Sequence, residues 1–178
     1  MCLAAGRCSV AVVTGAVGAV AWQDLEAGAP EIARLGLARL SAARVALLGT
    51  LRRDRSPRIS PVEPYVASGE LLIGVMASSA KAADLRRDQK YVLHSAVTGP
   101  DAGEGELKLS GTASTAGPDL RGAAADAWWL AWPPDKAIVF GLRIAHAAFV
   151  DWDLERGLLT VHQWSPFTGY RHARRAYP

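Results

Sequence analysis

The sequence predicts a mainly β chain of the α+β class, with a few helices beside the sheet. Three features support this prediction: an apolar run at 44–51 that continues on both alternating faces, a hairpin turn at 67–70, and a second hairpin at 155–157. The length of 178 residues suits one domain, and a domain of this size buries about 70% of its extended-chain surface. We therefore expect a single domain over residues 22–178.

Residues 1–21 are expected to be an extension outside this domain. The apolar run at 10–21 imitates a secretory signal with a small-residue cleavage site, and it is too short to span a membrane. A single preceding charge, Arg7, and glycines at 15 and 18 argue against a signal. We favour a poorly ordered arm or a wrongly assigned start codon.

The domain begins with an expected helix over residues 22–40, whose most regular part starts at Pro30. Ile32 and Leu35 share one face, but Arg39 takes the next position on that face, so the apolar stripe is imperfect. A helix that packs across one end of the sheet would have such a stripe.

Strand patterns then follow one another closely. Residues 44–51 are apolar on both faces, as a strand covered on both sides would be. The next run, 58–66, contains Pro61 and Pro64, which cannot donate ladder hydrogen bonds, so it belongs at an edge or against a ligand. The expected strands are 44–51, 58–66, 71–76, 91–97, 106–112, 137–152 and 158–164.

A serine-rich turn at 77–81 carries the clearest chemistry. Ser78 or Ser79 is a natural N-cap for the helix that follows. The free amides of a helix start, two hydroxyl groups and the Lys81 ammonium suit a phosphate. An ordinary capped helix with a solvated lysine is the alternative, and the turn taken alone favours it. The packed face of this helix is expected to hold Ala82, Ala83 and Leu85.

The order of these parts resembles the flavin-binding split barrel of the pyridoxamine 5'-phosphate oxidase family, over residues 32–153. The resemblance implies a six- to seven-stranded antiparallel split β-barrel with a few flanking helices. It also implies a homodimer, because the family binds its flavin between two subunits. The segments that carry the resemblance are GTLRRDRSPRISPV at 49–62, LIGVMASSAKAADLRR at 72–87, VLHS at 92–95 and EGELKLSG at 104–111.

The resemblance also implies a cofactor site. It places the flavin ring along 58–62 and the flavin phosphate at 79–81. Trp152 has the spacing of a tryptophan that the family brings against the flavin, and a tryptophan covering the end of the barrel is an equal alternative. The expected cofactor-binding residues are Arg58, Ser60, Pro61, Val62, Met76, Ser78, Ser79, Lys81 and Trp152.

The implied function is that of a flavin-dependent oxidoreductase, in which FMN transfers a hydride to or from a small molecule and the protein supplies orientation. Two arginines that hold the phosphate in the family fall on Ala80 and Ser60 here, which removes two guanidinium groups. Arg86 and Arg87 are weak candidates to compensate for this loss, because helix geometry points both away from the helix start. A 5-deazaflavin coenzyme is the alternative cofactor. A non-catalytic flavin-binding or cofactor-free dimeric barrel is the alternative function.

Three further positions bear on the site. Glu106 takes the place of a family glutamine near the flavin ring, where a carboxylate is less favourable beside an anionic reduced flavin. His94 is expected to be a hydrogen-bonded core or interface histidine rather than a general base, because the sequence places no acid beside it. Residues 158–161 lack the arginine and histidine with which the oxidase binds pyridoxal phosphate, and His162 is displaced, so this substrate is not expected.

The remaining segments are expected to be structural. A helix over 118–129 begins with a proline. Trp128, Trp129 and Trp132 should pack it onto the sheet or close the subunit interface, and an aromatic ligand cage is the alternative. The end of the chain, 171–178, is similar to the family's Arg-x-x-Pro terminus, but we expect a solvated basic tail.

The composition argues against several other classes. A formal net charge of +3, with no basic run interleaved with aromatic residues, does not support nucleic-acid binding. Cys2 and Cys8 have no partners at metal-binding spacing, so neither a metal site nor a disulfide framework is expected. We expect a cytoplasmic protein that acts on a small molecule and has no membrane or nucleic-acid partner.

Overall fold

A computed structural model of the chain describes residues 18–97, 105–124 and 127–177. The expected N-terminal extension lies for the most part outside these described residues. Its last part is described, and there Val20 forms an isolated antiparallel bridge with Ile144, with backbone N–O distances of 2.9 and 2.8 Å. This bridge attaches the chain to the sheet just before the first helix begins.

Nine antiparallel strands form one sheet in the described part of the chain, which confirms the mainly β prediction. The main strand order is β2-β1-β5-β6-β7-β4-β3, and β8 and β9 continue from the far half of β7. The sheet curls without closing, so it forms a split barrel. The strands are β1 (Ala46–Leu51), β2 (Pro57–Val62), β3 (Pro64–Ala67), β4 (Glu70–Met76), β5 (Lys90–Ser95), β6 (Glu106–Thr115), β7 (Ala137–Asp153), β8 (Leu158–Ser165) and β9 (Gly169–Ala176).

Two features raise the strand count above the expected six to seven. The predicted strand at 58–66 is divided at Glu63 into β2, which pairs with β1, and β3, which pairs with β4. Pro64, which cannot donate a ladder hydrogen bond, is the first residue of β3. The expected solvated tail is the strand β9, which pairs with β8 although all eight of its residues are exposed.

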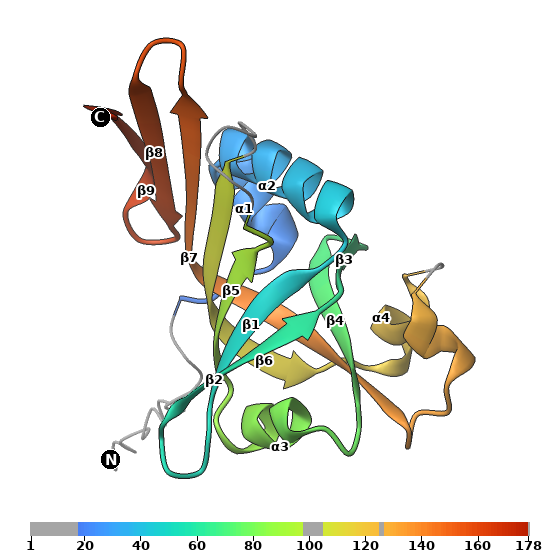
Figure 1. Cartoon of the computed structure of the whole chain (residues 1–178). Coiled ribbons are helices and arrows are strands. Elements are labelled where there is room, and N and C mark those ends of the chain that lie inside the picture. The colour runs from blue at the N-terminus through green and yellow to red at the C-terminus, as the bar shows by residue number, and fades with distance from the viewer. Residues whose placement is uncertain (1–17, 98–104, 125–126, 178) are drawn as a thin grey trace, which may run out of the picture.

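The helices cover opposite ends of the barrel, with α1 and α2 at one end and α3 at the other (Figure 1). The expected helix at 22–40 is two helices that meet at Ala29, whose backbone is not helical, because Pro30 starts a new helix. The expected helix at 118–129 is limited to a short helix and a 3-10 turn. The helical segments are α1 (Trp22–Gly28), α2 (Pro30–Ala43), α3 (Ala80–Arg87), α4 (Pro118–Gly122) and the turn η2 (Trp128–Ala131).

The main core lies between the inner face of the sheet and the first two helices. Trp22, Leu25 and Ile32 are fully buried there, together with Leu107 of β6. These side chains explain why the imperfect stripe of the expected helix suffices to cover one end of the barrel. No described helix is both long and apolar enough to cross a bilayer.

A second, smaller core surrounds Trp129. The Trp129 ring packs on Gly74 so closely that a Cβ atom at that glycine would lie 1.9 Å from the ring. Tyr65 lies edge-on to the same ring, with 4.7 Å between ring centroids. Trp129 therefore packs its segment onto the sheet as expected, whereas Trp132 is exposed.

Candidate functional site

Four of the expected cofactor-binding residues line one hollow of about 320 Å³ between β2, β4 and the start of α3. We call it the β2–β4 hollow. Its other walls are mainly apolar, with Glu63 as an acidic member, and the exposed Trp132 belongs to its lining. The fold therefore brings together residues from two strands and a helix. The four residues are Pro61, Val62, Met76 and Lys81.

Lys81 places a positive charge in this hollow. Its Nζ donates a hydrogen bond to the carbonyl oxygen of Pro61 over 2.7 Å, and burial lowers the pKa of Lys81 from its ordinary value. Because an ammonium group has three N–H donors, two remain for a ligand. The contact with Pro61 holds the cation beside β2, the strand along which the flavin ring is expected to lie.

The expected serines lie in three different settings. Ser79 caps α3, because its hydroxyl accepts a hydrogen bond from the Ala82 amide over 3.3 Å. Ser78 is exposed in the turn before the helix. Ser60 is buried on the inner face of β2 and is not among the residues that line the β2–β4 hollow.

Arg58 is held by a buried carboxylate. Its Nε donates to Asp84 Oδ2 over 2.7 Å, and Asp84 also accepts hydrogen bonds of 3.0 Å from Thr50 Oγ1 and from Arg87 Nη2. Burial acts to raise the pKa of Asp84, but the hydrogen bonds from Arg58, Arg87 and Thr50 outweigh it, and the pKa lies below its ordinary value. Asp84, only 3% exposed, is therefore ionised at neutral pH and fixes the direction of Arg58.

A second hollow, of about 370 Å³, lies between the outer face of α3 and the turn that joins β1 to β2. We call it the arginine hollow. Two alanines of α3, Ala80 and Ala83, belong to its lining. Its charged lining residues are Arg52, Arg53, Arg58, Arg87, Asp54 and Asp84.

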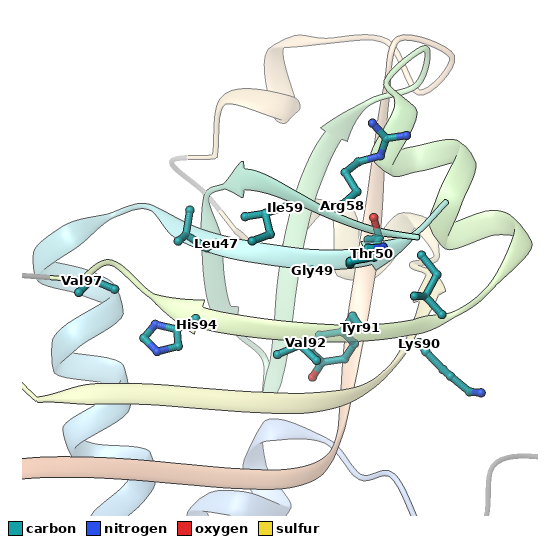
Figure 2. A pocket seen from close by; sticks show the side chains of 12 residues that line it. Leu47, Gly49, Thr50, Arg58, Ile59, Lys90, Tyr91, Val92, His94 and Val97 are labelled. Carbon is teal, nitrogen blue, oxygen red and sulfur yellow. The ribbon is translucent and has the colours of Figure 1, made fainter. Parts of the chain in front are cut away.

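A third hollow, of about 550 Å³, lies on the outer face of β1, β2 and β5. Figure 2 shows Leu47, Ile59 and Val92 on these adjacent strands, with the guanidinium group of Arg58 pointing away from them. These three side chains are 38%, 72% and 56% exposed. We call this surface the apolar face.

His94, at the edge of the apolar face, has an acidic neighbour. Its Nδ1 lies 2.7 Å from the carbonyl oxygen of Ser95, and its Nε2 lies 3.6 Å from Glu106 Oε2. Glu106 also pairs with Lys108 over 2.9 Å. The sequence-based expectation of a hydrogen-bonded histidine without an adjacent acid is therefore half right, because the pairing of β5 with β6 supplies Glu106.

No family model matches the sequence, and no curated protein matches it. Solved structures do match. PhzG from Burkholderia lata 383, in complex with tetrahydrophenazine-1-carboxylic acid, is 12% identical, with 82% of this chain and 88% of that chain covered at a TM-score of 0.58. A protein related to general stress protein 26, of the pyridoxinephosphate oxidase family, from Clostridium acetobutylicum is 12% identical, with 70% and 97% covered at a TM-score of 0.54. The chain has the split-barrel fold of the pyridoxamine 5'-phosphate oxidase family.

The same split barrel occurs in a heme binding protein from Mycobacterium smegmatis, which is 15% identical to this chain. That match covers 80% of this chain and 88% of that chain at a TM-score of 0.53. At these levels of identity the matches establish the fold. The ligand has to be argued from the residues that this split barrel brings together.

Trp152 does not join the other expected residues within one split barrel. It lies near the end of β7, where it pairs with Leu159 of β8. The β2–β4 hollow lies beside the opposite end of β7, where Met76 pairs with Ala137. A contact between Trp152 and a ligand in that hollow would therefore need a second subunit.

Sequence reasoning missed the buried carboxylate of this split barrel. We expected Ala83 on the packed face of α3, but Ala83 is exposed and Asp84 is buried. One signal was visible, since Asp84 directly precedes Leu85 on the apolar side of a short helix, and a buried acid requires partners. Within the described residues, no group of three or more His, Cys, Asp or Glu side chains is placed to hold a metal ion.

Proposed function

We propose that this protein is a flavin-dependent oxidoreductase that binds FMN, or a 5-deazaflavin coenzyme in its place, and transfers a hydride to or from a small molecule. The β2–β4 hollow carries the proposal, because it gathers four of the residues at which the resemblance implies the flavin. The split-barrel fold also supports the proposal, because a protein of the pyridoxinephosphate oxidase family has the same fold.

The chemistry of the hollow suits a flat ring with a polar edge. Met76 and Trp132 offer polarizable apolar surface to a ring system. Lys81 offers two N–H donors to a ring carbonyl or an anionic group. A bound flavin supplies the hydride chemistry, so the role of the protein is to bind the ring along β2, orient it and exclude water from one side.

The proposal includes a homodimer that buries the apolar face. A contiguous apolar patch with polar residues at its rim is typical of an interaction surface. Leu47, Ile59 and Val92 form such a patch on three adjacent strands, with Lys90 and His94 at its rim. A second copy that presents the same face about a two-fold axis would cover it. Such a dimer is also what a contact between Trp152 and the cofactor requires.

The alternative is a dimeric barrel that binds flavin without turnover or binds no cofactor. Two observations favour it: Ala80 and Ser60 carry no guanidinium group, and Arg58 and Lys81 already have partners within the chain. A substrate site would be needed for turnover, and residues 158–161 of β8 lack the arginine and histidine with which the oxidase binds its substrate.

The first test is the visible spectrum of the purified protein, with a thermal melt in a large excess of FMN. Ligand at about 100 times its dissociation constant adds about 2.7 kcal/mol, which for this chain length raises the melting temperature by about 5–10 °C. A flavin spectrum or that shift supports the proposal. No colour and no shift, with FMN and then with a 5-deazaflavin, would overturn it in favour of the cofactor-free barrel. A haem spectrum would assign the chain to haem binding instead.

A further inference from the structure

The arginine hollow is organised by a buried group and not by chance proximity of surface side chains. Asp84 is almost completely buried and receives hydrogen bonds from Arg58 and Arg87, which come from different elements. Arg87 Nη2 also donates to the carbonyl oxygen of Leu51 at the end of β1. Both guanidinium groups are therefore fixed before any ligand arrives, which lowers the entropy cost of binding.

Both fixed arginines keep donors for a ligand. Arg58 uses Nε for Asp84, and its two Nη groups make no hydrogen bond to the described residues. Arg87 uses Nη2, which leaves Nη1 and Nε. Guanidinium groups present several N–H donors in one plane and suit the oxygens of a phosphate.

The opposite wall of the hollow is a tightly bonded turn. The Arg52 amide donates to the Ser56 carbonyl over 2.9 Å, and Asp54 Oδ1 accepts from the Ser56 amide and hydroxyl over 3.0 and 2.6 Å. Asp54 is thus turned toward Ser56, and the hydroxyl hydrogen bond lowers its pKa. Arg52 and Arg53 line the hollow from this turn.

The charges of the hollow do not cancel. Four guanidinium groups line it with two carboxylates, Asp54 and Asp84, so two positive charges are left over. Both carboxylates already accept hydrogen bonds within the chain. A phosphate monoester carries nearly two negative charges at neutral pH, which matches this excess.

Ala80 and Ala83 leave the space that the phosphate needs. Both are exposed on the side of α3 that faces the turn of Arg52 and Arg53, because residues three apart on a helix lie on the same face. Ala80 is also the position at which the resemblance implies an arginine. An arginine side chain at this position would face guanidinium groups from the β1–β2 turn, from β2 and from the last turn of α3.

We infer that the arginine hollow binds a phosphate group, through Arg58 and Arg87 fixed by Asp84 and through Arg52 and Arg53 of the turn. As the phosphate of a flavin, this ligand rests on the proposed function, and the four arginines then replace the two that are lost at Ala80 and Ser60. A free phosphate ester offers the same chemistry without a flavin. Ser79 and Lys81 then serve the helix cap and the β2–β4 hollow.

FMN and riboflavin differ by one phosphate, so the ratio of their dissociation constants isolates this contact. We expect the full-length protein to bind FMN at least about tenfold more tightly than riboflavin. The double variant Arg52→Ala, Arg53→Ala keeps both partners of Asp84 and should lower the ratio about tenfold. Arg86→Ala, on the same helix but outside the hollow, is the matched control and should leave the ratio unchanged. Equal affinity of the unmodified protein for FMN and riboflavin would overturn the assignment of the hollow to the flavin phosphate and leave the flavin proposal standing.

Inorganic phosphate is the second probe, in thermal melts against chloride at equal ionic strength. Stabilisation by phosphate that is lost in Arg52→Ala, Arg53→Ala supports the site, even if neither flavin binds and the proposed function falls. Arg58→Lys keeps a positive charge beside Asp84 but loses the planar fork, and it should weaken both FMN preference and phosphate stabilisation. An absence of both effects in the unmodified protein would overturn the inference.

Discussion

Both faces of strands β1, β2 and β5 carry apolar side chains, but the two faces differ in how far those side chains are buried. On the inner face, Leu48 and Leu93 are fully buried by the core of the same chain. On the outer face, their sequence neighbours Leu47 and Val92 are exposed. The apolar pattern on both sides of β1 predicted a strand covered on both sides, but within this chain only the inner side is covered. The proposed dimer would cover the outer side.

The inner face should show the largest response to a substitution. Leu48→Ala removes a fully buried side chain and leaves a cavity, so the free energy of unfolding should fall by about 2–5 kcal/mol. Leu47→Ala, one residue away on the outer face, is the matched control and should cost clearly less. Equal losses in urea unfolding would contradict the distinction between the faces.

The buried carboxylate of Asp84 on α3, which accepts a hydrogen bond from Thr50 of β1, should respond next. Asp84→Asn weakens the contacts with Arg58, Arg87 and Thr50, and it should lower the free energy of unfolding by about 1.5–3 kcal/mol near neutral pH. The folded-state pKa of Asp84 is below its ordinary value, so its stabilisation is present above the unfolded-state pKa and is lost as the pH falls through the folded-state pKa.

The measurement is chemical unfolding of both proteins across the acid range. The difference between them should stay constant above about pH 5 and shrink below about pH 4, close to the ordinary pKa of an aspartate. A difference that persists in acid would mean that the buried ion pairs are not its source.

Lys81, in the first turn of α3, should affect ligand binding and leave stability nearly unchanged. Lys81→Ala removes the cation of the β2–β4 hollow and should weaken FMN binding by about one to two decades, as expected for one charge-assisted contact. Arg156→Ala, which removes an exposed charge from the β7–β8 turn, is the control in the same fluorescence titration. Unchanged affinity in Lys81→Ala would remove this lysine from the site.

The outer face should show the smallest change in unfolding and a clear change in assembly. Val92→Glu places a charge on the exposed side of β5, so the stability of the single chain should change by less than about 0.5 kcal/mol. In light scattering, the mass should fall from two chains to one chain of 18.9 kDa. Leu154→Glu adds the same charge at an exposed position outside the apolar face and should leave the dimer intact. A single-chain mass for the unmodified protein would rule out the dimer.

Local patterns were enough to predict most of the fold. Apolar runs and turns predicted seven of the nine strands, and the Ser79 cap and the start of α3 follow from residues that are near one another in the sequence. The division at Glu63 was not predicted, because a strand pattern does not show that β2 and β3 pair with different neighbours. The strand β9 was missed because its exposed, basic sequence lacks an apolar face.

The candidate site was predicted only in part, for a related reason. Lys81 and Pro61 were expected near one ligand, and their contact joins positions 20 residues apart. The Asp84 network joins that residue to Thr50 and Arg58, which are 34 and 26 residues away. Such pairings depend on how strands and helices dock in space, and one sequence without a fold does not specify them.

The exposed strand β9 bears on how the protein behaves at high concentration. A strand edge with unpaired backbone groups is a template for another chain, and charged side chains on an edge strand discourage such pairing. Arg171, Arg174 and Arg175 all lie on this strand and are exposed, so two such edges repel each other. At 0.1 M salt, repulsion between charges more than about 10 Å apart is largely screened. Colloidal stability of the protein should therefore be greater in dilute buffer than in concentrated salt.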